Sequence, residues 1–476
     1  MVALYILSAV AAVLIVLFAV SAVRAVLVKK ELPKGAAVAE GAESGYAERL
    51  ARLIRFETVS EKVGEETDKF ERYYEVVRAT YPEVFRHAER IRVGRSLLLR
   101  IRGDEASLAP ILLMAHADVV EVTPDGWKYP PYSGEIAEGK IWGRGTLDTK
   151  GAFAAYLSAL GELLSEGKRP RRTVYLLATP DEEIFGGGAA EACEYFKEKG
   201  IRFYTVIDEG GVITDGQLPG VKCGTAMFGV VEKGQGNIEF IARSAGGHSA
   251  MPPKNTPLAR LGALMADVDK KHPFPVRFSP ELRRMFRDAA PYAVFPMRLV
   301  FANLWLFAPL VKLLARKIPA LYAMLTTTIV FTKAAGSEMY NVIPDKATAV
   351  ANVRYIGFCQ GTEVRKVLEK KLKKRGIETN FISEYEYSEI TSTETPAYLE
   401  LKARTEEYFG VPVIPYIMTG MTHSRYLYPV SDAVIRFTPF KIDKEQLKSI
   451  HGKNECLEVS SLTKAVGFFK KYLKEI

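Results

Sequence analysis

The sequence predicts an α/β protein of more than one domain, preceded by an N-terminal apolar helix. The chain has 476 residues, which exceeds the size at which a single hydrophobic core usually stops growing. Beyond residue 45, short buried-strand runs alternate with helical stretches, an order typical of a sheet with helices on both faces. The first 23 residues carry no charged side chain, so they form a separate apolar segment.

That N-terminal segment predicts a membrane anchor. Twenty-three residues of helix extend about 35 Å, which is enough to cross a bilayer. Arg24 ends the apolar run, and Lys29 and Lys30 follow it. A cleaved signal peptide is the alternative, but the run is long for one and no Lys or Arg precedes it. We therefore predict a single-pass anchor over residues 1–28 and a linker over 29–44, with the side of the membrane left open.

The composition excludes several classes of protein. Apolar residues make up 48% and charged residues 25% of the chain, which excludes a disordered chain and a polytopic membrane protein. Four cysteines without a CxxC pair exclude a disulfide scaffold. The formal net charge is +9, and Lys254–Lys317 holds twelve Lys or Arg against four Asp or Glu. This excess suits a solvated face, an anionic lipid surface or an acidic substrate, whereas no motif for nucleic acid is present.

The larger domain begins with residues 45–233, where polar or acidic residues follow each buried strand. That edge is where open α/β sheets place their ligands. The predicted strands are 109–116, 173–178 and 203–207, and the predicted helices are 151–166 and 189–199.

The pattern then changes to half-exposed strands and amphipathic helices, which predicts a second, smaller α+β domain over 234–386. The first domain resumes over 387–476. The predicted elements of the second domain are the strands 237–242 and 347–355 and the helices 257–270 and 362–374.

An apolar, basic insert occupies residues 279–325 of this second domain. Its stretch Phe301–Leu325 is strongly apolar but contains Lys312, Arg316 and Lys317. Three cations in mid-segment disfavour a second membrane span. An amphipathic helix at a membrane surface or a dimer contact is the expected structure.

Histidines and carboxylates gather after the predicted strands, and these side chains predict a metal site. So many carboxylates at one sheet edge would repel one another without a cation. Histidine mixed with carboxylate suits Zn²⁺, with Mn²⁺ or Co²⁺ as substitutes. Five ligand groups exceed one tetrahedral zinc, which predicts two metals bridged by one carboxylate. The residues are His116, Asp148, Glu183, Asp208 and His451.

Seven motifs make the chain resemble a known family over about residues 45–476. They are MAHADVV, WGRGTLDTKG, ATPDEEIFGG, DEGG, GGHSAMPP, NVIPD and HGKNE. They resemble the co-catalytic zinc exopeptidases and amidohydrolases, and most of all the branch of carboxypeptidase S and the N-fatty-acyl-amino-acid hydrolases. The resemblance implies a zinc-peptidase α/β catalytic domain with an inserted ferredoxin-like lid domain at 234–386.

The resemblance also implies roles for individual residues. His116 and Asp208 are expected to bind one zinc, Glu183 and His451 the other, and Asp148 to bridge both. Glu182 is the expected general base, and Asp118 is expected to hydrogen-bond the far nitrogen of the His116 ring. The family usually has a cis peptide after the bridging Asp, which makes Asp148–Thr149 a candidate.

The expected lid carries further candidates. His248 matches the residue that stabilises the oxyanion, from the partner subunit in dimeric relatives, and Asn341 and Arg354 match positions that hold the substrate carboxylate. Arg425 is a further candidate substrate contact. His423 stands where this branch usually has Asp, as an added polar contact or a plain substitution, while His87 and His272 are expected at the surface.

The resemblance implies hydrolysis of an amide bond next to a free carboxylate. N-fatty-acyl amino acids are the expected substrates, with peptides cleaved by a membrane-anchored carboxypeptidase as the alternative. A catalytically inactive, membrane-anchored binding protein is the alternative from another class, but all five ligands and the base are present. The expected partners are the substrate, a bilayer reached through the N-terminal helix and 279–325, and a second copy bound through the lid.

Overall fold

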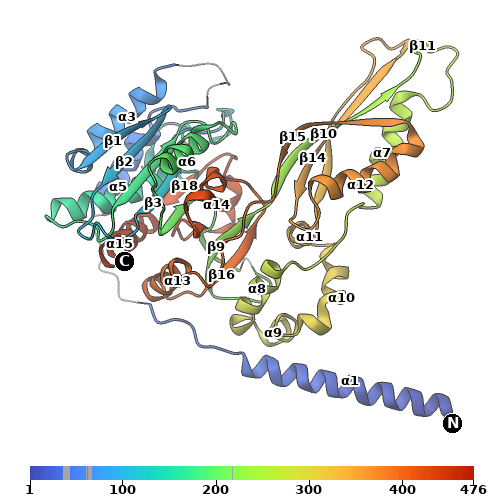
Figure 1. Cartoon of the computed structure of the whole chain (residues 1–476), viewed down its shortest axis with the longest axis horizontal. Helices are drawn as coiled ribbons and strands as arrows, with labels where there is room; N and C mark the ends of the chain where they lie inside the picture. The colour runs from blue at the N-terminus through green and yellow to red at the C-terminus, as the bar shows by residue number, and fades with distance from the viewer. Residues whose placement is uncertain (36–42, 61, 63–66, 217) are drawn as a thin grey trace.

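The computed structural model describes residues 1–35, 43–60, 62, 67–216 and 218–476. A large mixed sheet lies between helices, a smaller antiparallel sheet projects to one side, and a long N-terminal helix runs along the base (Figure 1). The zinc-peptidase type of α/β architecture with a second, smaller sheet, expected from the motifs, is therefore present in outline.

The large sheet has nine strands in the order β1-β2-β6-β3-β7-β17-β9-β16, with β8 paired to β9. Strand β3 runs parallel to both β6 and β7, and β7 runs parallel to β17. The carboxyl ends of these central strands therefore meet at one edge of the sheet. The strands are β1 (Ala88–Val93), β2 (Ser96–Ile101), β3 (Ile111–His116), β6 (Val174–Thr179), β7 (Thr205–Asp208), β8 (Ile213–Asp215), β9 (Gly224–Glu232), β16 (Val413–Met418) and β17 (Val434–Arg436).

Helices cover both faces of this sheet, as its alternating apolar side chains require. Leu97 and Leu99 of β2 enter the core beneath α5 and α15, whereas Leu98 enters the core beneath α6. The helices of this domain are α2 (Glu43–Ile54), α3 (Lys69–Thr80), α4 (Pro82–Phe85), α5 (Lys150–Ser165), α6 (Gly188–Glu198), α13 (Pro396–Phe409), α14 (Lys444–Ser449), α15 (Val459–Glu475) and the 3₁₀ segment η3 (His423–Val430).

A three-stranded sheet beside the large one joins two distant parts of the chain. Its strands are β4 (Glu135–Ala137), β5 (Lys140–Trp142) and β18 (Cys456–Glu458), and β5 pairs with both of the others. The loop after β5 and the loop before β18 are thereby held side by side, although more than 300 residues separate them in sequence.

The smaller projecting sheet has its own hydrophobic core, under α7 (Pro257–Lys270) and α12 (Gly361–Leu372). Its order is β12-β14-β10-β15, all antiparallel, and a two-stranded ladder of β11 and β13 lies at its outer tip (Figure 1). The strands are β10 (Gly234–Arg243), β11 (Gly247–His248), β12 (Thr328–Ala335), β13 (Val342–Ile343), β14 (Lys346–Tyr355) and β15 (Ile377–Tyr385).

The insert folds as a series of short helices rather than as one long helix. Proline stands near the start of α8 (Pro280–Ala289), α9 (Phe295–Ala302) and α11 (Pro319–Leu325), where its fixed φ begins a helix and stops the preceding one. Asn303 separates α9 from α10 (Leu304–Ala315), and the two helices meet at a bend of 110°.

The insert packs on the large domain and not on the projecting sheet to which the sequence assigned it. Helix α8 lies against β16, and Phe286, Phe301 and Leu304 belong to the core of the large sheet. The insert thus interrupts the sequence of the smaller domain, but its buried apolar side chains belong to the core of the larger domain.

Helix α1 (Val2–Leu27) is the one described helix that is long and apolar enough by itself to cross a membrane. Only 6% of its most apolar window is buried. The predicted linker 29–44 is irregular up to Gly35 and enters α2 at Glu43, while residues 36–42 lie outside the described part. The predicted strands and helices of 109–208 are confirmed within two residues at each end.

Candidate metal centre

Three neighbouring strands deliver polar groups to the same sheet edge. His116 is the last residue of β3 and pairs with Thr179, the last residue of β6, so the loop holding Glu182 and Glu183 starts beside it. Strand β7 ends at Asp208 on the other side of β3. The parallel register therefore explains why these residues meet although His116 and Asp208 are 92 positions apart in sequence.

Asp148 lies between two histidines from opposite ends of the chain. Its Oδ1 is 2.8 Å from His116 Nε2, and its Oδ2 is 3.0 Å from His451 Nε2. His451 Nε2 is also 3.2 Å from Glu183 Oε2. His116, Asp148 and Glu183 can direct one ligand atom each to a common point. This arrangement is what a carboxylate shared between two cations requires.

Asp118 organises the loop that follows β6. Its carboxylate accepts hydrogen bonds from the backbone N–H groups of Glu182 and Glu183, at 3.1 and 3.0 Å, and from the Ser60 hydroxyl at 2.8 Å. His116 Nδ1 lies 2.9 Å from the Asp118 carbonyl oxygen, which can only accept, so Nδ1 carries the proton and Nε2 is left free for a ligand. The Asp118 carboxylate itself is 3.4 Å from Nδ1.

Glu209 is a carboxylate of the site that the sequence-based ligand set omits. Its Oε1 lies 3.5 Å from His116 Nε2, and it forms a second possible ligand group with His116 and Glu182. Asp208 instead accepts a hydrogen bond from the backbone N–H of Ser424 at 3.2 Å. Glu209 is the first residue after β7, and its side chain, unlike that of Asp208, is placed within 3.5 Å of the His116 ring. The DEGG motif itself contains no signal that distinguishes the two acids.

The Asp148 loop is held by another residue that the sequence reasoning missed. Glu455 is fully buried and accepts hydrogen bonds from the backbone N–H groups of Gly145, Leu147 and Asp148. Arg144 donates to the other Glu455 oxygen at 2.6 Å. The Asp148–Thr149 peptide is cis, as the family resemblance implied. Glu455 belongs to the HGKNE motif, so the loop that supplies His451 also positions Asp148.

The electrostatics of the cluster call for positive charge. Burial and the nearby Glu209 raise the pKa of Glu182 well above its usual range, and burial with Asp148 does the same for Glu209. Hydrogen bonds from His451 to Asp148 and Glu183 raise the pKa of that histidine to about 10. Two imidazoles and four carboxylates therefore fit divalent cations of the zinc type by donor chemistry and by charge.

The comparisons with known proteins identify the family of the chain. The sequence profile described as Peptidase family M20/M25/M40 matches residues 112–475. The chain belongs to this M20 family. It is 31% identical over 441 residues to the N-fatty-acyl-amino acid synthase/hydrolase PM20D1 of Xenopus tropicalis, covering 91% of this chain and 86% of the relative. It is 27% identical over 489 residues to carboxypeptidase S of Saccharomyces cerevisiae, covering 90% and 84%.

Solved structures of the family share the fold. An M20 family metallo-carboxypeptidase from Sulfolobus solfataricus superposes with a TM-score of 0.66 at 18% identity, covering 90% of this chain and 98% of that one. Human carnosine dipeptidase 1 gives 0.63 at 14% identity, covering 91% and 96%. Membership of the M20 family makes the chain a hydrolase that acts on amide bonds, as expected.

A cavity of about 280 Å³ opens beside the candidate metal ligands of the M20 chain. Asp148, Glu182, Glu209 and His451 form its polar end. The remaining wall is mostly apolar, and the apolar side chains that line it are Leu147, Val212, Met418, Met421, Phe440, Ile442, Leu447 and Ile450.

The candidate substrate residues of the smaller domain do not reach the cluster within one chain. His248 and Asn341 stand at the outer tip, His248 in β11 and Asn341 directly before β13, and both are exposed (Figure 1). Arg354 lies near the inner end of β14, with its Nε 3.2 Å from Asn352 Oδ1. Arg425 is close to the junction of the two sheets, where its Nη1 is 3.6 Å from Glu232 Oε2.

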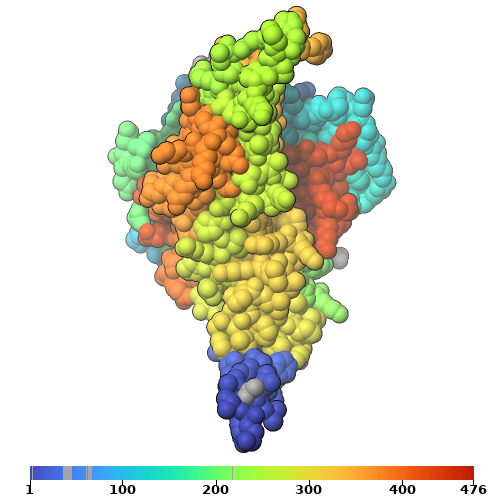
Figure 2. Space-filling view, turned by 90° about the vertical axis from the view of Figure 1, so that its right-hand side faces the viewer, coloured from blue at the N-terminus to red at the C-terminus, as the bar shows by residue number. Residues whose placement is uncertain are grey.

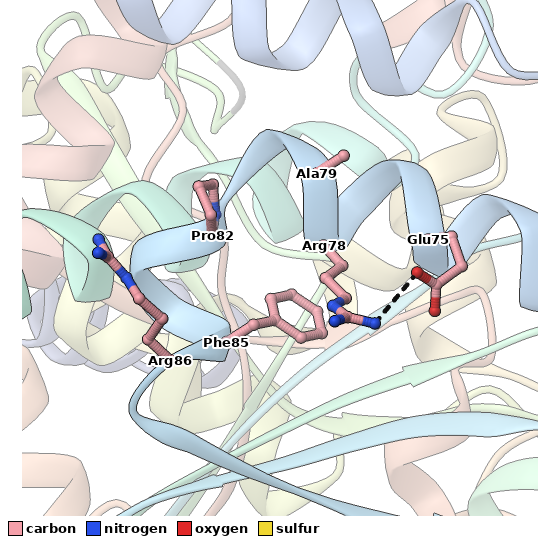
Figure 3. A pocket seen from close by; sticks show the side chains of 6 residues that line it. All are labelled: Glu75, Arg78, Ala79, Pro82, Phe85 and Arg86. Carbon is pink, nitrogen blue, oxygen red and sulfur yellow. Dashed lines mark hydrogen bonds and ion pairs between the residues drawn. The ribbon is translucent and has the colours of Figure 1, made fainter.

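Two further features are not part of the cluster of candidate ligands. His423 is buried with its Nδ1 3.0 Å from the Thr179 hydroxyl, and burial lowers its pKa to about 4, so it is a neutral core residue. A surface hollow of about 360 Å³ between α3 and α4 contains none of the candidate residues (Figure 3). Arg78 and Glu75 at its rim form an ion pair of 3.4 Å.

Proposed function

We propose that the protein is a membrane-anchored, two-metal amidohydrolase that cleaves N-fatty-acyl amino acids. The observation that carries this proposal is the apolar cavity beside the metal-binding residues. A cavity with one polar end and a long apolar wall suits an amide whose acyl group is aliphatic. The relative from Xenopus tropicalis is named for N-fatty-acyl amino acids, which supports the same substrate class.

We propose Glu209 in place of Asp208 as the ligand beside His116. His116 and Glu209 would hold one metal, Glu183 and His451 the other, and Asp148 both. Zinc ions in such a site lower the pKa of a bound water and polarise an amide carbonyl. Asp118, Glu455 and Arg144 keep the ligand loops in position through the hydrogen bonds described above.

Glu182 is proposed to move the proton. It stands at the polar end of the cavity beside Glu209, whose charge contributes to the raised pKa of its carboxyl. It would take a proton from the attacking water and return it to the leaving amine. Its backbone is fixed by Asp118, so its side chain remains free to turn between these two partners.

Helix α1 is proposed to remain attached as an anchor. Its docked end supports retention, because Ser21 and Ala25 are fully buried against the rest of the chain. A signal sequence that is removed would not be expected to contribute buried contacts to the folded protein. The proposed partners are thus a bilayer through α1 and, through the smaller domain, a second copy of the chain.

A panel of substrates tests the proposed chemistry. The purified full chain should release amino acid faster from N-oleoyl and N-lauroyl amino acids than from N-acetyl amino acids or dipeptides, with about two zinc ions bound per chain by elemental analysis. Leu447→Trp at the cavity rim should lower the long-chain rates and spare N-acetyl substrates. Leu399→Trp, at an exposed position of α13, is the matched control.

Carboxypeptidase action on peptides is the second candidate, favoured by the named activity of the yeast relative. Faster cleavage of dipeptides than of every N-acyl amino acid would establish it. A chain that binds zinc but cleaves neither class would establish the inactive binding protein.

A further inference from the structure

The outward face of α10 in the insert is apolar. Trp305, Leu310, Leu313 and Leu314 are each between 46% and 63% exposed, and Pro309 lies among them. These residues recur at helical spacing on one side, whereas Leu304, Val311 and Ala315 on the opposite side are buried. A helix at a water-facing surface normally shows polar side chains on that side, so this face requires a cover.

Helix α1 lies directly beside this insert. Asn303, at the α9–α10 bend, is fully buried and donates its side-chain N–H₂ to the carbonyl oxygens of Ser21 and Leu299, both at 2.9 Å. The backbone N–H of Lys30 reaches the Pro291 carbonyl at 3.4 Å. In both overall views α1 and the insert occupy one end of the molecule, and the tip of the smaller sheet occupies the opposite end (Figures 1 and 2). The helix is therefore docked on the insert at its C-terminal end.

The length of α1 determines how close the insert lies to a bilayer that this helix spans. The helix has 26 residues, and a crossing takes about 20. Every stretch of that length within Val2–Leu27 includes Ser21, which is buried at the contact with the insert. The part of α1 before Leu17 would extend only about 22 Å, short of the roughly 30 Å hydrocarbon core. Any span formed by α1 therefore brings the α9–α10 bend to the membrane surface.

Positive charge surrounds the same region. Arg316 and Lys317 follow the apolar face directly and are exposed. Lys29, Lys30 and Lys34 follow α1 and are also exposed. Apolar side chains flanked by cations are what an anionic bilayer surface binds, because the side chains enter the acyl boundary while the cations meet headgroups.

We propose that α1 and the exposed residues of the insert form one continuous membrane-docking surface. Its residues are the exposed side of α1 with Phe295, Trp305, Leu310, Leu313, Leu314 and Ile318. The surface holds the catalytic domain flat against an anionic bilayer instead of leaving it on a flexible tether. This inference rests on the proposed anchor and not on the proposed amide chemistry.

Photolabelling in vesicles tests the docking surface. The full chain is reconstituted in phosphatidylcholine–phosphatidylglycerol vesicles that contain a phospholipid with a diazirine in its acyl chain, and labelled peptides are identified by mass spectrometry. We expect label on α1 and on 295–318, and none on the exposed Met251 and Tyr340 at the tip of the smaller sheet. Label on α1 alone overturns the docking surface, whereas label on neither segment overturns the anchor as well.

A double variant tests whether the apolar face of α10 is covered by the bilayer or by a second copy of the chain. Leu313→Glu with Leu314→Glu should reduce insert labelling at least fivefold and leave α1 labelling unchanged, while Ile382→Glu, at an exposed position of β15, should change neither. Vesicles of phosphatidylcholine alone should also reduce insert labelling severalfold. Unchanged labelling together with loss of a dimer in detergent, measured by light scattering, would overturn the proposal in favour of a subunit contact. Hydrolysis of N-acetyl amino acids, measured in parallel, verifies that each variant is folded.

Discussion

Asp118 shows how one buried carboxylate can fix both acidic residues of the β6 loop. It binds the backbone of Glu182 and Glu183 and leaves both of their side chains free. Glu183 can therefore face His451 while Glu182 faces the cavity. Asp118 holds this loop through its backbone N–H groups. A substitution of the Glu182 side chain should therefore abolish proton transfer and leave the candidate metal ligands in place.

Glu182→Gln should retain about two metals per chain and lose at least about 100-fold in kcat, because an amide of the same shape cannot accept the proton of water. Elemental analysis and steady-state hydrolysis of an N-acyl amino acid measure the two effects. Glu194→Gln, on the exposed side of α6, is the control and should behave as the unchanged protein. Near-normal turnover of Glu182→Gln would exclude this residue as the base.

Glu209 and Asp208 make opposite predictions for metal binding. Glu209→Ala should lower the bound metal from about two ions to about one per chain, since the His116 side of the site loses a ligand. Asp208→Asn should retain both metals and lower thermal stability, because Asp208 supports the Ser424 backbone rather than the cluster. Loss of metal in Asp208→Asn with full metal in Glu209→Ala would restore the assignment made from the sequence.

Most residues of the cluster could be predicted from the sequence because they follow parallel strands, whose carboxyl ends meet at one edge of the sheet. His116, Asp148, Glu183 and His451 do lie within a few ångströms of one another. The choice between two adjacent acids depends on which way a strand's last side chain points, and a motif such as DEGG contains no such information. Glu455 was overlooked because most of its partners are backbone N–H groups, which no pattern of side chains displays.

At the scale of elements, the insert was the least predictable part. Its composition indicated one amphipathic stretch, but prolines and Asn303 divide it, and its buried side packs on β16. Apolar composition alone cannot distinguish which side is buried when both sides are apolar. Helix α7 and strand β14 were predictable because each buries a single periodic face, whereas α5 is buried on almost all sides and was predictable from its length and apolar content.

His272 corrects a second expectation, because it is half-buried between the insert and the smaller sheet and not at the open surface. Its ring packs on Phe274 and Tyr322, and its Nε2 is 3.1 Å from the Thr326 hydroxyl. Burial, with the nearby cations of Lys233 and Arg316, lowers its pKa to about 4. His87, the other histidine expected at the surface, is exposed.

This histidine should make the protein sensitive to acid. The unfolded chain takes up the proton near pH 6.5 and the folded chain only near pH 4, so the folded state loses stability as pH falls through that window. His272→Gln should reduce the loss by on the order of 1 kcal/mol, a value discounted because the ring is partly exposed to solvent. Thermal unfolding measured from pH 4 to 7 compares this variant with His87→Gln, which should leave the slope unchanged. Equal slopes for all three proteins would contradict the prediction.

At the scale of the whole molecule, the two sheets meet at a short junction between β9 and β10. Glu232 ends β9 with its carboxylate bound to Arg436 Nε at 2.7 Å and to the Thr422 hydroxyl at 2.6 Å, all three residues being buried. The next residue, Lys233, donates to the carbonyl oxygens of Ala323 and Thr326, at 2.7 and 2.8 Å. The smaller sheet therefore projects from a fixed base, and its tip carries His248 away from the metal cluster of its own chain (Figure 1).

This geometry predicts that His248, if it stabilises the oxyanion, does so in the active site of a second copy of the chain. Its Nδ1 accepts a local hydrogen bond from the Ala250 N–H at 3.1 Å, and its side chain is exposed. His248→Ala and Glu182→Gln should each be inactive alone. Co-expressed in one membrane, they should recover about one quarter of wild-type activity, because half of the randomly formed dimers pair an intact cluster with an intact His248 at one of two sites. The matched control combines Glu182→Gln with Asp148→Ala, which should stay inactive because both changes damage the cluster itself. Absence of recovery with heterodimers demonstrated by two affinity tags would mean that His248 acts within its own chain, through closure of the smaller sheet, or not at all.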